Sequence, residues 1–260
     1  KVDKQWFKDW AAKNNPPLVH GRIDWVKRTT YLADREAKRG TSFPTLTYFE
    51  EMRASTIEKP WITFQDEWGV DTFTDRQWPD EAVMRRGFNA SPYSLISFPQ
   101  SYQDMCLFYA NEWFKRGVGL YCDNTYPQAC YDPLTSAAYV TEDGTVQPAL
   151  SIWNQRAYQK RLWNLLQEHR KTSKVPLEWS IHMTTTLLLP LQTFATIQLD
   201  YEFNATQPAK PDYIRTTMLG SKCGNLPYAL YHLAGRYNPL IKNLSKPHVQ
   251  LIEWGMRRVH

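Results

Sequence analysis

The run from Gly117 to Pro127 limits the possible folds of this 260-residue chain more than any other stretch. Residues 117–122 are mostly apolar, and the run then changes abruptly to Asp123, Asn124 and a turn. Helical spacing of apolar residues precedes it, at 102–116. A helix followed by a short apolar strand is typical of a buried parallel sheet. We therefore expect an α/β fold with Asp123 at the carboxyl end of a strand.

That position makes Asp123 the first candidate for a functional residue. In open α/β sheets and (β/α) barrels, ligands bind at the carboxyl ends of the strands. The alternative is ordinary turn chemistry, because Asp and Asn side chains bond readily to nearby backbone.

Further elements follow from periodicity and from Gly and Pro positions. Other strands are expected at 43–49, 61–64, 176–182 and 194–202, and an Asp-Gly pair predicts a hairpin over 140–146. Helices are expected at 1–17, 22–38, 148–171, 213–220, 226–234 and 247–260.

Strands that alternate with helices imply a parallel sheet, and a length near 250 residues suits one (β/α) barrel. We predict a TIM-like barrel that fills residues 1–260 as a single domain. Only about four strands are clear, so we expect the barrel to be partial or decorated with long loops, and the chain to be complete or a fragment of a longer one.

Composition narrows the classes of partner. The net charge of +5 is mild and the basic residues are dispersed, which argues against a nucleic-acid partner. No apolar run is long enough to span a membrane. The chain holds 11 Trp, 15 Tyr and 11 Phe, which suit either a large core or contacts to the flat faces of sugar rings.

Neither a metal nor a cofactor is expected from motifs. The four cysteines, at 106, 122, 130 and 223, lack the spacing of a zinc site. Gly220 and Gly224 do not form a phosphate-binding loop.

Polar side chains end the predicted strands at Asp123, His182, Asp200 and Glu202. In a barrel these ends face one cavity. Two carboxylates that flank a bond are the apparatus of glycoside hydrolysis. We expect Asp123 to act as nucleophile or transition-state stabiliser and Glu202 as general acid, with Asp200 as the third catalytic candidate.

Other residues are candidates for binding the sugar. Asp200, His182 and Asn124 would hold hydroxyls, and Trp68, Tyr126 and Tyr201 would form a stacking wall. His182 has further possible roles as a base or, less favoured, as a metal ligand. The adjacent pair Asp66 and Glu67 is a second acidic candidate, although a solvated loop explains it slightly better.

Several of these segments together resemble one protein family. They are Gly119–Pro127, Glu142–Pro148, the helix with Asn154, Arg156, Lys160 and Arg161, and the strand ends at His182, Pro190, Phe194 and Leu199–Glu202. They resemble an uncharacterised bacterial group of glycoside-hydrolase-like barrels related to the β-N-acetylgalactosaminidases. The resemblance implies a (β/α) barrel, often beside β-sandwich domains, that acts on carbohydrate.

The same resemblance implies a mechanism. The named enzymes use an adjacent Asp-Glu pair with help from the acetamido group of the substrate, and Asp66 with Glu67 would fill that role. This chain has Tyr201 where the family pattern leads us to expect Gly before the last Glu.

The prediction from sequence is therefore a secreted or periplasmic glycoside hydrolase with an oligosaccharide or polysaccharide substrate, and with no nucleic-acid partner and no cofactor. The alternative is a non-catalytic carbohydrate-binding barrel domain. A third possibility is a structural domain whose aromatic residues all lie in the core. Oligomeric state does not follow from the sequence.

Overall fold

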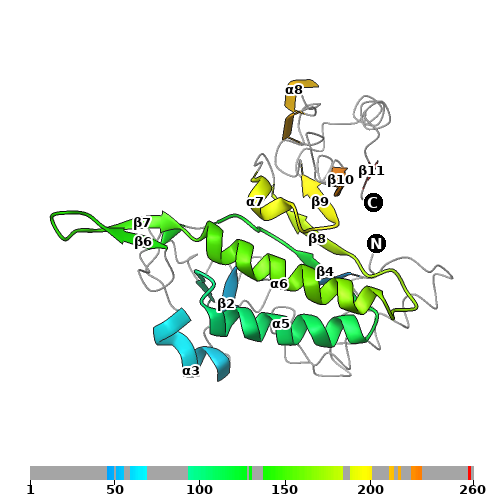
Figure 1. Ribbon diagram of the computed structural model, residues 1–260, viewed down its shortest axis with the longest axis horizontal. Helices are drawn as coiled ribbons and strands as arrows, with labels where there is room; N and C mark the ends of the chain where they lie inside the picture. Colours follow the sequence, from blue (N-terminus) through cyan, green and yellow to red (C-terminus); the bar gives the residue numbers. More distant parts are fainter. Residues whose placement is uncertain are drawn as a thin grey trace, which may run out of the picture.

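A computed structural model describes most of the central part of the chain (Figure 1). The described residues are 46–49, 51–55, 59–68, 93–127, 129–130, 137–183, 188–200, 211–213, 216–217, 224–229 and 257–258. The helices expected at 1–17 and 22–38 lie outside them.

A six-stranded parallel sheet forms the centre of the described part. In spatial order its strands are β1 (Leu46–Tyr48), β4 (Gly119–Cys122), β8 (Trp179–His182), β9 (Ile197–Asp200), β10 (Leu226–Ala229) and β11 (Arg257–Arg258). Every neighbouring pair is parallel. This sheet confirms the predicted α/β class. Among the described residues no pairing joins β1 to β11, so this part of the sheet is open.

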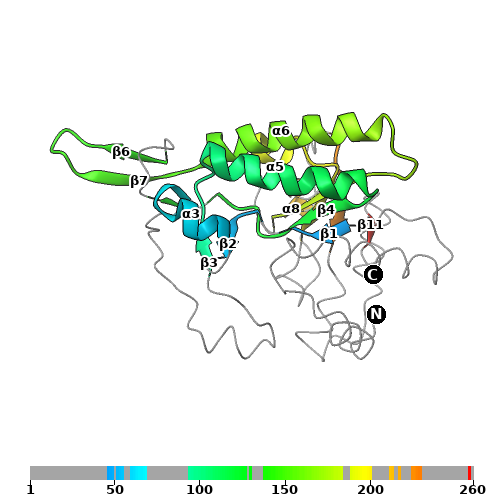
Figure 2. The ribbon, with the colours of Figure 1, turned by 90° about the horizontal axis from the view of Figure 1, so that it is seen from below.

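Two long helices cover one face of the sheet. Helices α5 (Gln100–Lys115) and α6 (Ile152–Arg170) lie side by side along it (Figure 2). Side chains alternate between the faces of a strand. Alternate residues of β4 and β8 are therefore directed at the helices, and they are fully buried: Leu120, Cys122, Trp179 and Ile181.

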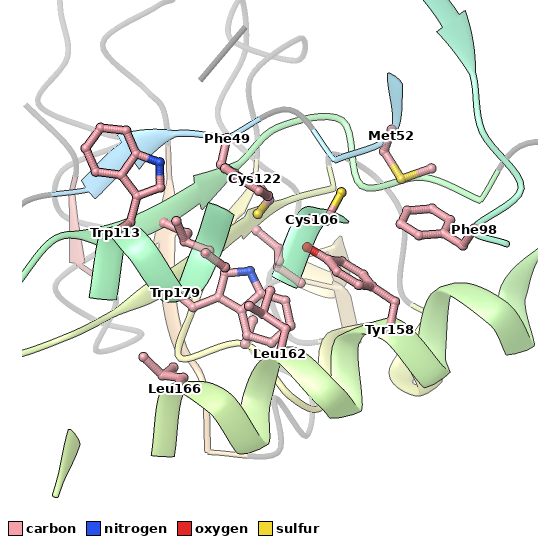
Figure 3. Packing of buried hydrophobic residues seen from close by; sticks show 14 of the residues in the cluster. Phe49, Met52, Phe98, Cys106, Trp113, Cys122, Tyr158, Leu162, Leu166 and Trp179 are labelled. Carbon is pink, nitrogen blue, oxygen red and sulfur yellow. The ribbon is translucent and has the colours of Figure 1, made fainter. Parts of the chain in front are cut away.

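The core between this face and the helices is rich in aromatic residues (Figure 3). Trp113 of α5 and Tyr158 of α6 are both completely buried there. Figure 3 shows Tyr158 directed from α6 toward Cys106 and Cys122. Glu51, which follows β1, is also fully buried, and its charge adds to burial in raising the pKa of Tyr158 well above its usual value.

Smaller elements surround the sheet. A 10-residue helix, α3 (Lys59–Trp68), follows β2 (Arg53–Ser55), which pairs antiparallel with β3 (Tyr93–Leu95). Short helices α7 (Leu189–Gln192) and α8 (Pro211–Tyr213) flank β9. None of the helices in the described ranges is both long and apolar enough to cross a membrane.

An extended β-hairpin projects from the body of the described structure (Figures 1 and 2). Its strands β6 (Ala138–Val140) and β7 (Val146–Leu150) pair antiparallel, and β5 (Ala129–Cys130) pairs with the other edge of β7. The Asp-Gly turn predicted from sequence is present, with Gly144 at φ 84°. The hairpin prediction is therefore confirmed.

Three of the predicted elements are wrong, and a fourth begins later than predicted. Residues 61–64 belong to helix α3, where the aromatic spacing 61, 64 and 68 fits a helix better than a strand. Pro148 lies inside β7 and does not open α6. Residues 226–229 form strand β10 because β9 offers them a parallel partner, with Leu226 N donating to Thr196 O at 2.9 Å. Residues 257–258 likewise form a strand and are not helical.

Candidate functional site

The sheet face opposite α5 and α6 carries a polar cluster. Its members are Tyr48, Tyr121, Asp123 and His182. Tyr121 alternates with the buried Leu120 and Cys122, so its side chain leaves β4 on this second face. Register places Tyr48 of β1 directly beside Tyr121, and their ring centroids are 5.3 Å apart in an edge-to-face arrangement. His182 is at the carboxyl end of β8 on the same face.

Asp123 follows β4 at the centre of this cluster. Its Oδ2 accepts a hydrogen bond from the Tyr48 hydroxyl at 2.6 Å. Its Oδ1 accepts from the Tyr121 hydroxyl at 3.1 Å and from the backbone N–H of Asn124 at 3.0 Å. The carboxylate side chain is 19% exposed, so solvent still reaches it.

His182 completes the cluster from β8. Its Nδ1 lies 2.8 Å from Asp123 Oδ1 and 3.1 Å from the Tyr121 hydroxyl. An ionised carboxylate accepts hydrogen bonds only, so His182 must carry its proton on Nδ1. The neutral ring then has its lone pair on Nε2. The side chain is 4% exposed.

The hydrogen bonds around Asp123 determine its charge. Burial of the carboxyl group acts to raise its pKa, but the hydrogen bonds from His182, Tyr48 and Tyr121 and the charge of His182 outweigh burial, and the pKa is lowered. Asp123 is therefore ionised at neutral pH. Such a group serves as a nucleophile, a base or an anionic stabiliser rather than as an acid.

The loop after Asp123 is held firmly in place. Asn124 adopts a left-handed conformation with φ 53°, which Asn tolerates better than most residues. The backbone N–H and the hydroxyl of the buried Thr125 both donate to His182 O, at 3.2 and 3.1 Å. Gln155 on α6 donates through Nε2 to Thr125 O at 2.9 Å. The loop is thereby tied to both β8 and α6, which fixes the approach of Asp123 to His182.

Asp200 lies at a strand end but leaves β9 on the other face. The preceding residue, Leu199, packs with Tyr121 and Tyr228 on the face that bears Asp123. By alternation, Asp200 is directed to the helical side, where it is 2% exposed and accepts a hydrogen bond from Tyr213 at 2.6 Å. The structure does not bring Asp200 together with Asp123.

Helix α3 holds the adjacent acidic pair and Trp68. Asp66 and Glu67 are exposed on this helix, and Glu67 accepts a hydrogen bond from Ser101 at 2.5 Å. Trp68 is 1% exposed and donates through Nε1 to Ser101 at 2.7 Å. It packs in the core against Tyr102 and offers no open face for a stacked sugar.

The remaining predicted site residues lie near the cluster or outside the described residues. Asn124 and the half-buried Tyr126 belong to the loop after β4. Glu202 and Tyr201 lie outside the described residues, so their predicted roles remain predictions. Within the described ranges, no three His, Cys, Asp or Glu side chains are grouped so that they could hold a metal ion.

Two residues of the cluster, Tyr48 and Tyr121, were not predicted from the sequence to belong to the site. Tyr121 lies two positions before Asp123, and residues two apart on a strand share a face. The spacing of two residues could therefore have predicted that Tyr121 lies on the same face as Asp123. Tyr48 comes from β1, and its place beside Tyr121 depends on the register between two strands far apart in sequence.

Comparisons with known proteins do not add an identification. No protein-family model matches this sequence, and no curated protein matches it.

Proposed function

We propose that this chain is a glycoside hydrolase of the (β/α)-barrel type, with its site at the carboxyl ends of β1, β4 and β8. One observation carries the proposal. Asp123 is an ionised carboxylate at a strand end, accepting hydrogen bonds from Tyr48, Tyr121 and His182 on a single face of the sheet. Glycoside hydrolysis needs a fixed negative charge beside an oxocarbenium-like transition state.

The two oxygens of Asp123 are suited to different tasks. Oδ1 accepts from Tyr121, Asn124 and His182, which exhausts its lone pairs. In the described part of the chain, Oδ2 accepts from Tyr48 alone. Oδ2 is therefore the oxygen with the capacity to face the anomeric carbon, as nucleophile or as electrostatic stabiliser.

The arrangement of layers supports the barrel. In the described part of the chain, helices α5 and α6 cover one face of the parallel sheet, and the second face carries Tyr48, Tyr121 and His182. A doubly wound sheet has helices on both faces, whereas the second face of a barrel sheet lines the interior. In the proposed fold, Asp123 lies at the mouth of that interior. An extracytoplasmic location remains part of the proposal through the resemblance alone.

A second candidate function is carbohydrate binding without catalysis. Asp200, which ends the strand beside β8, is directed to the opposite face of the sheet from Asp123, so these two carboxylates do not form a pair. The partly exposed ring of Tyr48 beside Tyr121 offers aromatic surface of the kind that contacts sugar rings.

A hydrolysis screen distinguishes the two candidates. Wild type, Asp123→Asn and the control Asp143→Asn are assayed on aryl glycosides, N-acetylgalactosaminides included, and on polymeric glycans. Asp143 lies on the exposed tip of the hairpin. We expect the wild type and Asp143→Asn to cleave one substrate equally, and Asp123→Asn to lose roughly 10²- to 10³-fold in kcat.

Two results would overturn the proposal. One is full activity of Asp123→Asn on the substrate that the wild type cleaves. The other is binding of a glycan by the wild type with no cleavage anywhere in the screen, which would establish the binding function instead.

A further inference from the structure

We propose that the hairpin of β6 and β7 is a docking surface for a second copy of this chain. In the proposed dimer, two hairpins pack face to face and antiparallel around a twofold axis. The proposal uses none of the residues of the cluster around Asp123 and does not depend on the proposed function.

One face of the hairpin is wholly apolar. Directly opposite residues of two paired strands lie on the same face, and so do residues two apart along one strand. The register pairs Val140 with Val146 and Ala138 with Pro148. Leu150 follows two positions after Pro148 on the same strand. We call these residues the apolar face.

The apolar face is open to solvent. In the described structure Val140, Val146 and Leu150 are 59%, 41% and 47% exposed. An antiparallel sheet with one apolar face ordinarily packs that face on a core. A contiguous exposed apolar patch indicates a contact surface instead. Because the hairpin projects from the body, another molecule can reach the whole face (Figures 1 and 2).

The tip of the hairpin favours a protein partner over a lipid surface. Glu142 and Asp143 are exposed at the tip. Hydrogen bonds from the Thr141 hydroxyl and the Thr145 backbone N–H lower the pKa of Asp143 to about 2, so the tip carries negative charge. Anionic membrane surfaces repel such a tip. The partner must therefore offer an apolar surface for the face and a basic group for the tip.

A second copy of the chain offers both. In a twofold dimer the same patch lies on both sides of the axis, so the apolar face packs against an identical apolar face. The middle of this face is the pair Ala138 and Pro148. With the axis at that pair, the tip at residue 143 extends about 16 Å beyond it, at about 3.3 Å per residue. Leu150 is only two residues from the axis, so the tip passes it and reaches the start of α6 in the other copy.

The start of α6 carries the groups that this alignment requires. Helix α6 extends away from the hairpin tip (Figure 1), and Trp153 in its first turn is 71% exposed. Lys160 is exposed seven positions later on the same side of the helix. A helical side chain is inclined toward the N-terminus of its helix, so Lys160 extends toward the acidic tip. Trp153 enlarges the apolar contact, and Lys160 is the cation for Glu142 of the partner subunit.

Sedimentation velocity of the full chain tests the dimer. Between about 1 and 200 µM we expect a reversible change from monomer to dimer with a Kd of about 10 to 100 µM, because a hairpin face is smaller than the interfaces of stable complexes. Val140→Lys should raise the Kd at least about 10-fold, since it places like charges across the axis. Leu150→Lys is the second variant should the first not fold.

Tyr139→Lys is the matched control for Val140→Lys. Tyr139 is the preceding residue of the same strand and is 57% exposed, but it pairs with Gln147 on the opposite face of the hairpin. The two variants add the same charge at neighbouring positions. The control should dimerise as the wild type does.

Charge reversal tests the antiparallel alignment. Glu142→Lys and Lys160→Glu should each raise the Kd by about 3- to 10-fold, because each interaction between the subunits occurs twice in a twofold dimer. The double variant should return to within about 2-fold of the wild type. Net charge alone gives a different pattern, because the first substitution raises the net charge from +5 and the second lowers it.

The remaining outcomes overturn the proposal. A wild type that stays monomeric at every concentration would exclude the dimer, and protection of Val140 from carbene labelling in that monomer would assign the face to another segment of the same chain. Equal weakening by Val140→Lys and Tyr139→Lys would show that the apolar face is not the contact. Failure of the double charge reversal to restore the dimer would refute the antiparallel alignment. None of these results bears on glycoside hydrolysis, which is assayed separately.

Discussion

A substitution at Tyr48 tests, without any substrate, what keeps Asp123 ionised. Its hydroxyl donates to Oδ2 at 2.6 Å and is one of the groups that lower the Asp123 pKa. A carboxyl group whose folded pKa lies below its unfolded pKa adds stability above the unfolded value. That contribution is lost as the pH falls through the folded pKa.

We therefore predict that Tyr48→Phe raises the pKa of Asp123, measured by NMR titration of its carboxyl carbon. The free energy of unfolding at neutral pH should fall by about 1 kcal/mol or less, because the hydroxyl is partly solvated. Acidification should then cost the variant less stability than it costs the wild type. Tyr139→Phe is the control, since the Tyr139 ring is 57% exposed on the hairpin. An unchanged Asp123 titration in Tyr48→Phe would contradict the hydrogen bond.

At the scale of elements, the closeness of β4 to its neighbours depends on Gly119. A Cβ built at Gly119 would lie 2.2 Å from Glu178 O and 2.7 Å from Leu46 Cδ2. Glu178 O is a backbone atom, so it cannot move away by a change of side-chain rotamer. Any side chain at this position forces β4 away from β8 or β1, and those strands carry His182 and Tyr48.

Gly119→Ala should therefore destabilise the protein by about 3 kcal/mol, at the upper end of the cost of overpacking. It should also weaken the contact between Asp123 and His182. The measurement is urea unfolding together with the NMR signal of the His182 Nδ1 proton. Gly144→Ala is the matched control: its Cβ meets open space, and only the positive φ is strained, at a cost of roughly 1 kcal/mol. Similar losses in the two variants would argue against close packing at Gly119.

At the scale of the whole molecule, one hydrophobic cluster joins the sheet to both long helices. It contains Phe49 after β1, Leu120 of β4, Trp179 of β8, Trp113 of α5 and Leu162 of α6. Figure 3 shows Leu162 beside Trp179. Shared burial of this kind makes elements unfold together. We therefore expect the described elements between residues 49 and 195 to unfold as one unit.

Leu162→Ala should lower the free energy of unfolding by about 3 kcal/mol, because the side chain is completely buried. Tryptophan fluorescence and far-ultraviolet circular dichroism should report the same shifted midpoint in urea. Val140→Ala, at a site 59% exposed on the hairpin, should change the free energy by less than about 0.5 kcal/mol. Two separate transitions would contradict unfolding as one unit.

Local chemistry in the sequence was sufficient for several features. The apolar run before Asp123 predicted β4 and its carboxyl end, helical spacing predicted α5 and most of α6, and the Asp-Gly pair predicted the hairpin. These features are determined by neighbours within a few residues. The presence of Asp123 and His182 at strand ends was predictable for the same reason.

Tertiary structure decided the rest. Residues 226–229 became a strand because β9 supplied hydrogen-bonding partners, and Trp68 became a core residue because α3 turns it against Tyr102. Asp123 contacts Tyr48 and His182 only because of the register of three parallel strands. On β9, Leu199 pairs with His182, so the next residue, Asp200, is directed to the opposite face of the sheet. Strand register depends on contacts between segments that are distant in sequence, and periodicity along the chain carries no record of it.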